Sequence, residues 1–323
     1  MRITKLKVVG ALIAALALAV AGLTGCSSSE SSEGQRELTV GFVVDPSWAH
    51  IPVAQQEGYF ADRGLNVKVV NFSTGVEALQ ALTAGQVDVT TAAAVPTSAA
   101  VIKTPTLRVA ADGSRWEGFR LVARKQSGIR SLQDLNGKRI GTPLGTSGAY
   151  FASKVVEGSG TDAELVQVAP SAIVTAITQG DVDAVSIFQP YQAQAIAALG
   201  ADAVALEPPG GTLVDHCLFV TTEAAASERQ ADLTAFFEAL GDASKDLTAQ
   251  TDGAVTAVAD ATKLDPALVK DVLSGYDFTL QLKPALADDL AALGAWAQQN
   301  GKIEPNVTLP DYSQFLDTQF IKS

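Results

Sequence analysis

Short runs of β-branched residues alternate with helical patterns along most of this chain, and this alternation restricts its fold more than any other feature. A first strand is expected at Leu38–Val44, then a helix over Val53–Phe60 that ends near Gly64, then a second strand at Val67–Val70. Such alternation is typical of crossover units, in which helices cover a sheet of mainly parallel strands. The sequence therefore predicts an α/β fold.

One order of elements occurs twice. Residues 81–89 read ALTAGQVDV, and residues 176–184 read AITQGDVDA. In each stretch a helical pattern ends at a glycine, Gly85 or Gly180, where a positive φ is wanted, and a short apolar strand follows. We interpret this echo as the same step in two successive series of strands and helices, and we expect two lobes built alike.

The length of the chain also favours two lobes, because the region from about Glu37 to Ser323 exceeds a single comfortable core. An apolar strand at Phe119–Ala123 is expected to cross to the second lobe, and a strand at Cys217–Thr221 to return. These crossings predict a first lobe of residues 37–119 and 217–323, and a second lobe of residues 120–216.

Other elements follow from the same patterns. They are a helix at Gly75–Ala84, a strand at Val87–Thr90, a helix near Pro96, a capped turn at Ser131–Gly137, a strand at Lys138–Gly141, a helix at Ser147–Val156, a strand at Val166–Val168, a helix at Ala172–Thr178, and strands at Val185–Phe188 and Ala203–Leu206. From Ser227 onward we expect mostly helices, which end at Gly241, Pro266, Pro284 and Pro305.

The N-terminus has the pattern of an export signal. Three basic residues within the first seven positions precede an uncharged apolar stretch, Val8–Ala21, that is short for a membrane span. Leu23-Thr24-Gly25-Cys26 then resembles the lipobox of bacterial lipoproteins. The resemblance implies a signal peptide over residues 1–25 and an acylated Cys26 that anchors the protein at the outer face of the cytoplasmic membrane. An ordinary cleaved signal or an uncleaved anchor is the alternative.

Composition narrows the function. Residues 26–36 are rich in serine and are expected to form a flexible tether. Without residues 1–25 the chain has 20 basic against 35 acidic side chains, a net charge of −15, which disfavours binding to nucleic acid. Cys217 is the only cysteine besides Cys26, so an acylated Cys26 leaves no intramolecular disulfide.

Five motifs occur in order between about Leu38 and Gly200. They are Ala54–Phe60 followed by Gly64–Val67, Gly75–Asp88, Ser131–Gly141, Gly145–Gly148, and Gly180–Tyr191. Together they resemble the type II periplasmic solute-binding proteins of ABC importers, in the branch that serves aliphatic sulfonates, taurine, nitrate and thiamine precursors. The resemblance implies a two-lobed periplasmic-binding-protein type II fold with two hinge crossings. It also implies a ligand in the cleft between the lobes, and closure that presents both lobes to a membrane permease.

A cleft of this kind is also expected on physical grounds, because ligands of open parallel sheets lie beyond the carboxyl ends of the strands, where helix N-termini carry unpaired N–H groups. Thr146, Ser147 and Gly148 lie between a strand and a helix and are our first candidates to hold an anionic or polar group. A simple helix cap is the alternative. Trp48 and His50 follow the first strand, where the family's ligand touches the first lobe, although both residue types are often packing.

The remaining candidates lie at another helix start, at a strand end and beside the crossings. They are Ala94, Thr97, Trp116, Gln189 and His216. Gln189 can donate and accept, which suits a fixed polar contact. Arg115 and Arg120, beside the first crossing, are the basic residues expected near the cleft.

Catalysis finds little support, since the sequence has neither a G-x-S-x-G elbow nor an H-E-x-x-H motif. We expect no metal and no cofactor, because two histidines without further ligands do not specify a metal site. We predict a monomeric, lipid-anchored, extracytoplasmic protein that captures a small organic or anionic solute, such as a sulfonate, taurine or nitrate, for an ABC permease. Two alternatives remain: a thiamine-precursor binding protein or enzyme of the same fold, and a ligand sensor for a membrane signalling partner.

The lipobox gives a direct test. Cys26→Ser should abolish incorporation of labelled fatty acid, because the thiol is the attachment point. Radiolabelling of parent and variant in the native host measures it, and equal labelling of the two would refute lipidation at Cys26.

Overall fold

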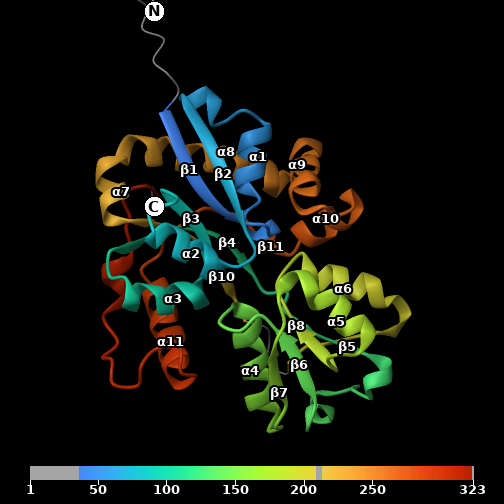
Figure 1. The fold of residues 1–323 in the computed structure, drawn as a ribbon. Coiled ribbons are helices and arrows are strands. Elements are labelled where there is room, and N and C mark those ends of the chain that lie inside the picture. Colours follow the sequence, from blue (N-terminus) through green and yellow to red (C-terminus); the bar gives the residue numbers. More distant parts are fainter. Residues whose placement is uncertain (1–35, 209–212, 322–323) are drawn as a thin grey trace, which may run out of the picture. The chain divides into compact units, whose positions relative to one another are not determined.

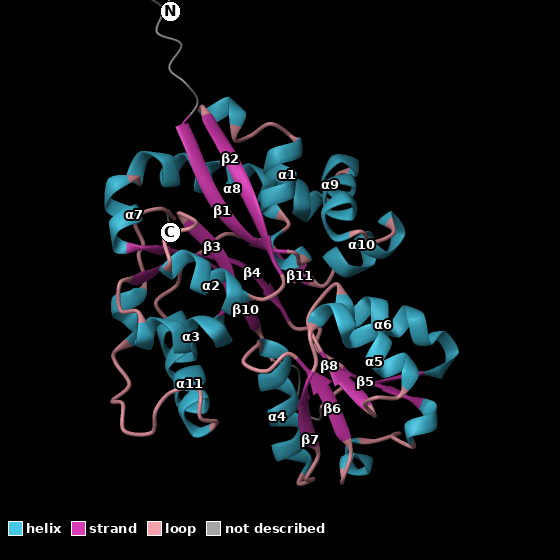
Figure 2. Cartoon of the chain, viewed as in Figure 1, coloured by secondary structure: helices cyan, strands magenta, loops and turns pink. Residues whose placement is uncertain are grey.

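Two β-sheets organise the chain, and they lie in separate parts of the ribbon in Figures 1 and 2. The computed structural model describes residues 36–208 and 213–321. The predictions for the signal peptide, for Cys26 and for most of the tether therefore lie outside the described residues. No helix within the described ranges is long and apolar enough to cross a membrane.

The first sheet, with the helices packed on it, is called lobe 1. Its strand order is β11-β4-β10-β3-β1-β2. The strands are β1 (Arg36–Val43), β2 (Leu65–Phe72), β3 (Val89–Ala93), β4 (Leu107–Trp116), β10 (Asp215–Thr222) and β11 (Tyr276–Asp277). The helices are α1 (His50–Gln56), α2 (Gly75–Thr83), α3 (Ala94–Lys103), α7 (Glu223–Glu228), α8 (Gln230–Ala249), α9 (Asp252–Thr262), α10 (Pro266–Leu273) and α11 (Leu286–Gln299).

The second sheet, with its helices, is called lobe 2, and its strand order is β7-β6-β8-β5-β9. The strands are β5 (Leu121–Arg124), β6 (Arg139–Thr142), β7 (Glu164–Gln167), β8 (Ala184–Ser186) and β9 (Ala203–Leu206), and the helices are α4 (Ser147–Ser159), α5 (Ile173–Gln179) and α6 (Tyr191–Leu199). The chain passes from β4 to β5 and returns from β9 to β10. The two-lobed α/β fold with two crossings is thus confirmed.

The repeated wording of the sequence corresponds to repeated structure. In each lobe three parallel strands have the order β2-β1-β3 or β7-β6-β8, and the helix before the third strand ends at a glycine with positive φ. Asp88 Oδ2 accepts a hydrogen bond from Thr39 N at 2.7 Å, and Asp183 Oδ2 accepts one from Arg139 N at 2.9 Å. The aspartate of each V-D pair therefore links β3 to β1 in lobe 1 and β8 to β6 in lobe 2.

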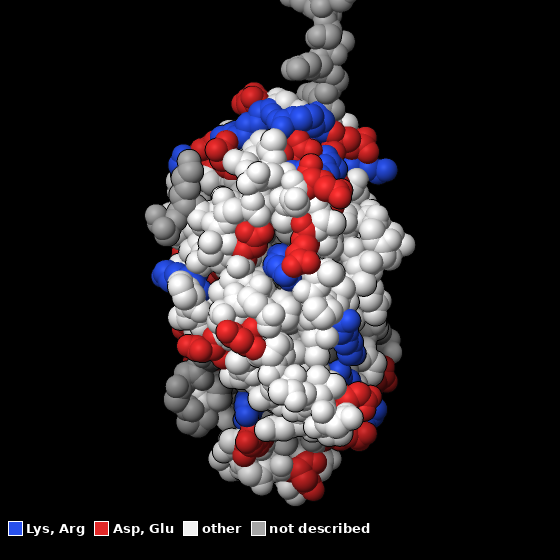
Figure 3. All heavy atoms as spheres, turned by 90° about the vertical axis from the view of Figure 1, so that its left-hand side faces the viewer, with Lys and Arg blue, Asp and Glu red and all other residues white. Residues whose placement is uncertain are grey.

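Lobe 1 buries both faces of its sheet. Along β10, Phe219 packs into a core with α1, α8, α9 and α10, while Leu218 and Val220 pack on the opposite face with α2, α3 and α11. Side chains alternate between faces along a strand, so one apolar run supplies two cores. On the face shown in Figure 3, basic and acidic side chains are interspersed and much of the surface is uncharged.

Several expected elements differ from the structure. The helix expected at Val53–Phe60 is α1, which starts earlier and ends at Gln56. Strand β4 was not among the elements expected from the sequence. In the structure Gly113 lies at a register shift between β4 and β10, where a Cβ atom would come within 2.5 Å of the Phe219 ring.

The C-terminal part is mostly helical, as expected, but two of its helix ends were predicted wrongly. Gly241 does not end a helix but lies inside α8, where a Cβ atom would meet nothing within 4 Å. Pro266 begins α10 instead of ending a helix, which suits its fixed φ and missing N–H. Helix structure ends at Gln299, and only a short turn at Tyr312–Phe315 follows among the described residues.

Two glycines of α4 provide a matched test of packing. A Cβ atom on Gly148 would lie 2.8 Å from Ser186 O, whereas one on Gly158 would meet nothing within 4 Å. Gly148→Ala should therefore lower the free energy of unfolding by about 1–3 kcal/mol. Gly158→Ala should raise it by about 0.5–1 kcal/mol, because alanine has the higher helix propensity. Urea denaturation measures both, and equal effects would contradict this view of the α4–β8 contact.

Candidate functional site

A small cavity lies where the carboxyl ends of strands in both lobes converge. Its volume is about 20 Å³, enough for roughly one water-sized group. The lining residues of lobe 1 and of the return to it are Val43, Asp45, Ser47, Trp48, Gly75, Ala93, Pro96 and Asp215, and those of lobe 2 are Thr146, Ser147 and Phe188. We call this space the inner cavity. It occupies the position that an open parallel sheet favours for a ligand.

Asp45 supplies one carboxylate to the inner cavity. It lies two residues after the end of β1 and is only 2% exposed. Its Oδ1 atom accepts hydrogen bonds from Ser47 N at 2.7 Å and from Ser47 Oγ at 2.6 Å, and a hydrogen bond from Tyr276 also acts on this carboxyl group. Burial raises the pKa of Asp45 from 3.8 to about 7, more than the bonds from Ser47 lower it, and the nearby Asp215 raises it further.

Asp215 supplies the second carboxylate, at the first residue of β10. It is 5% exposed, and its Oδ1 atom accepts a hydrogen bond from Ser147 Oγ at 2.7 Å. Burial raises the pKa of Asp215 to about 7, although Ser147 and His216 act in the opposite direction. The lining of the inner cavity thus contains two largely desolvated carboxyl groups.

A larger groove adjoins the inner cavity. It has a volume of about 580 Å³, within the usual range for ligand pockets. Its lining is mostly apolar and comes from α2, α3, the C-terminal end of α11, and the Leu144-Gly145 pair of lobe 2. Pro96 lines both spaces, and Gly145 of the groove is followed directly by Thr146 of the inner cavity. We call this space the outer groove.

Thr146, Ser147 and Gly148 lie at the start of α4, as the sequence predicted. Thr146 Oγ1 donates to Pro143 O at 2.7 Å, and Ser147 Oγ donates to Asp215. Both hydroxyl hydrogens are therefore used within the protein. Gly148 is buried and packs against Ser186, whose Oγ donates to Gly148 O at 2.7 Å. Their contact with a ligand stays a prediction.

Trp48 and His50 follow β1 but have different surroundings. Trp48 lines the inner cavity, and its Nε1 donates to Leu218 O at 3.1 Å. His50 is fully buried between the rings of Phe219 and Phe278, with Nε2 3.0 Å from Phe278 O. Because a carbonyl only accepts, Nε2 carries the proton. Burial lowers the pKa of His50 to about 4, so the ring is neutral at pH 7.

The other candidates lie around the cavity without lining it. Ala94 is the first residue of α3, next to the lining residue Ala93, and Thr97 Oγ1 donates to Ala93 O at 2.9 Å. Gln189 is adjacent to the lining residue Phe188, and its Oε1 accepts from Ala193 N at 3.1 Å. Trp116 stacks with Tyr276 and packs on Phe119.

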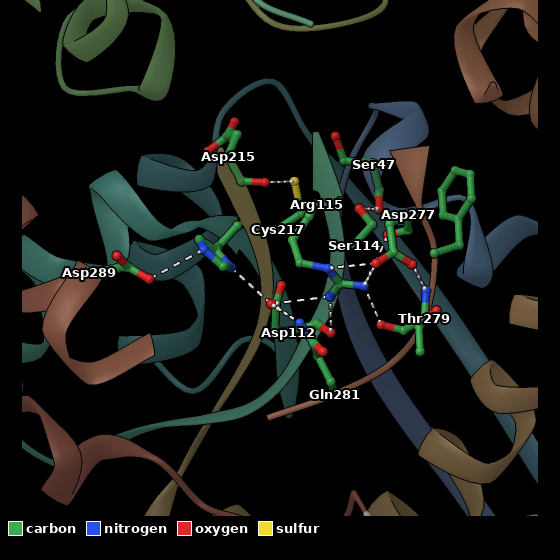
Figure 4. Close-up of polar contacts among 12 residues, drawn as sticks. Ser47, Asp112, Ser114, Arg115, Asp215, Cys217, Asp277, Thr279, Gln281 and Asp289 are labelled. Carbon is green, nitrogen blue, oxygen red and sulfur yellow. Dashed lines mark hydrogen bonds and ion pairs between the residues drawn. The ribbon is translucent and has the colours of Figure 1, made fainter. Parts of the chain in front are cut away.

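His216 and Arg115 belong to a polar network at the crossing strands, which Figure 4 shows around Asp112. Asp112 Oδ2 lies 2.9 Å from His216 Nδ1 and 3.2 Å from Arg115 Nη1. Arg115 Nη2 also contacts Asp277 Oδ2 at 2.9 Å and Thr279 O at 2.6 Å. The network joins β4, β10, β11 and the segment that follows β11.

The basic side chains near the crossing are thus already paired. Arg120 contacts Glu207 at 2.7 Å and lies, like Arg115, outside the lining of the inner cavity. Within residues 36–208 and 213–321, no three His, Cys, Asp or Glu side chains are placed to hold a metal ion. As described, the site can bind a small molecule through carboxylates and backbone groups between aromatic walls.

Sequence reasoning overlooked the two carboxylates. After the first strand the sequence analysis chose Trp48 and His50 as candidates, and it did not choose the nearby Asp45. Asp215 precedes a predicted strand and carried no local signal of its own. An aspartate directly after the first strand of an α/β lobe was the available clue, because that position faces the ligand end of the sheet.

The profile of a family described as NMT1/THI5 like matches residues 45–254. A putative aliphatic sulfonates-binding protein of Bacillus subtilis (strain 168) is 25% identical over 285 residues, which cover 83% of this chain and 82% of that protein.

Solved structures share the fold. The alkanesulfonate-binding protein SsuA from Xanthomonas axonopodis pv. citri, bound to MOPS, has a TM-score of 0.73 at 21% identity and covers 87% of this chain and 98% of its own. The desulfurization enzyme DSZB has a TM-score of 0.64 at 15% identity, covering 88% of this chain and 97% of its own. The fold therefore occurs in binding proteins and in an enzyme.

The buried carboxyl groups make stability depend on pH. A folded-state pKa of about 7 against an ordinary 3.8 means that the folded state holds more protons between these values. Stability contributed by Asp45 and Asp215 is therefore present below pH 4 and lost as pH rises toward 7. The stability contributed by the buried, neutral His50 instead increases with pH, because its pKa is lowered. The free energy of unfolding is therefore compared between the parent and a variant that keeps His50.

We expect the free energy of unfolding of the parent, relative to Asp45→Asn, to fall between about pH 4 and 7 and to level off above. The slope should not exceed about 1.4 kcal/mol per pH unit for one group. Asp215, Tyr276, His216 and Asp112 are the titratable groups that influence this pair. Urea denaturation across the range measures the difference, and a difference independent of pH would contradict the raised pKa values.

Proposed function

The chain belongs to the NMT1/THI5-like family, and on this premise we propose that it is the extracytoplasmic, lipid-anchored solute-binding component of an ABC importer. The observation that carries the proposal is the inner cavity, because residues of both lobes line it. A solute bound there contacts both lobes and so favours their closed arrangement. The likeness to binding proteins in sequence and in fold supports the same function.

The crossings explain how such a protein can signal occupancy. We propose that residues 37–119 with 217–323 rotate against residues 120–216 when solute binds, while each lobe keeps its own core. The closed surface is then recognised by a membrane permease. A tether from an acylated Cys26 to β1 keeps the monomeric protein near that permease, which raises its effective concentration there.

The solute is proposed to be a small organic molecule, and the sulfonate-binding relative makes sulfonates, taurine and nitrate the first compounds to test. A thiamine precursor, with its flat ring, would need the outer groove, whose volume is about 580 Å³. Because the desulfurization enzyme DSZB has a similar fold, an enzymatic function is the alternative to test. However, no histidine lines the inner cavity among the described residues, and the Ser147 hydroxyl donates its hydrogen bond to Asp215. A histidine that could act as general base for Ser147 is therefore not part of this lining. A sensor that passes occupancy to a signalling protein would use the same cleft.

A compound panel separates these functions. Sulfonates, taurine, nitrate and a hydroxymethyl aminopyrimidine are screened by thermal shift, since a binder of the folded state raises the melting temperature. We expect one compound class to bind and to be recovered unaltered after long incubation, as mass spectrometry can show. Turnover of the bound compound would show that the protein is an enzyme. Uptake of the compound that persists after deletion of the gene would favour a sensor.

A further inference from the structure

The inner cavity is lined by two carboxyl groups and by no Lys, Arg or His side chain among the described residues. Asp45 and Asp215 are each more than nine-tenths buried, and the recorded serine hydrogen bonds all use their Oδ1 atoms. Largely buried carboxyl groups are stabilised by hydrogen-bond donors and by positive charge. Two of them around one small space therefore favour a ligand that supplies donors or positive charge.

Asp215 lies beside the start of helix α4. The helix begins at Ser147, and its N-terminal end favours a negative group. The Ser147 hydroxyl at this end already donates to Asp215 Oδ1. An anionic ligand in the inner cavity would therefore lie beside a carboxyl group of the protein.

The size of the inner cavity points the same way. A space of about 20 Å³ admits roughly one water-sized group. An ammonium group is of this size and donates three hydrogen bonds, which suits two carboxyl groups that line one space. Trp48 and Phe188 also line the space, and aromatic faces attract cations. A sulfonate group, with three oxygens, is larger and only accepts.

The outer groove provides for the rest of the molecule. It is mostly apolar, far larger than the inner cavity, and shares Pro96 with it. Its two basic side chains are Lys103 and Lys302, and neither lines the inner cavity. Positive charge in this region of the protein thus lies apart from the two carboxylates.

Resting on the proposed function, we propose that the captured solute is an amphipathic organic amine. Its protonated amino group enters the inner cavity between Asp45 and Asp215, and its apolar body lies in the outer groove. The two aspartates are then the residues that select for a cationic head.

Matched probes test this ligand class. Hexylammonium and hexanesulfonate share one apolar chain and differ in the sign of the head group. With ligand-stripped full chain, we expect hexylammonium to raise the melting temperature in a concentration-dependent manner and hexanesulfonate to have no effect. Asp45→Asn and Asp215→Asn should each weaken hexylammonium binding at least about tenfold, because each removes a charge-assisted hydrogen bond.

Asp62→Asn is the matched control, since it removes one acidic charge from an exposed position of lobe 1 and should leave binding unchanged. The comparison of the two probes on the parent needs no variant, so a variant that fails to fold does not spoil the test. Circular dichroism of each variant verifies its fold.

Binding of hexanesulfonate but not hexylammonium would overturn the proposal. Loss of that binding in the Lys103→Gln/Lys302→Gln variant would place the anionic head in the outer groove, and the proposed solute-binding function would stand. Failure of both probes to bind would also reject the amine. The solute-binding function itself would fail only if the compound panel and protein purified from its host both yielded no bound molecule.

Discussion

The antiparallel pairing of β4 with β10 is the interaction on which the arrangement of both lobes depends. These strands are the last element before the chain leaves lobe 1 and the first after it returns, and they lie side by side in the same sheet. Around them Asp112, Arg115 and His216 form a buried polar network that reaches the segment after β11. Removing one member of such a network would leave a largely buried charge without its partner, which is costly. The network therefore stabilises the paired ends of β4 and β10, from which both crossings start. Asp215, at the start of β10, is thereby held at the inner cavity.

The fold could be predicted largely from local patterns, because most elements have a clear period and a clear stop. The echo between residues 81–89 and 176–184 was sufficient to predict two similar lobes, and the structure shows its physical basis in the bonds made by Asp88 and Asp183. Strand β4 was not predicted, and its register shift at Gly113 depends on the partner strand β10. Gly241 was misread because a glycine can lie on the open side of a long helix at modest cost. In both cases the role of the glycine depends on the atoms around it in the folded protein, and a local sequence pattern carries no information about them.

The candidate site was less predictable than the fold. The sequence indicated the start of α4 and the exit of β1, and both regions line the inner cavity. It did not indicate that Ser147 and Asp215, which are far apart in the sequence, form a hydrogen bond, or that His50 is enclosed by Phe219 and Phe278. These pairings arise only when the second crossing brings β10 back beside β3 and β4. The chemistry of the cavity therefore depends on long-range topology. The two carboxyl groups that line it were not part of the site for an anionic or polar group that the sequence predicted at the start of α4.

The central claim is that the cleft between the lobes captures a small solute through Asp45 and Asp215. Native mass spectrometry of the protein purified gently from its own host tests this most directly, with the Asp45→Asn/Asp215→Asn variant prepared in parallel. The account predicts one small molecule per chain in the parent, released on denaturation and missing from the variant. An equal mass increment in parent and variant, or a parent that carries no small molecule after exposure to host extract, would contradict it.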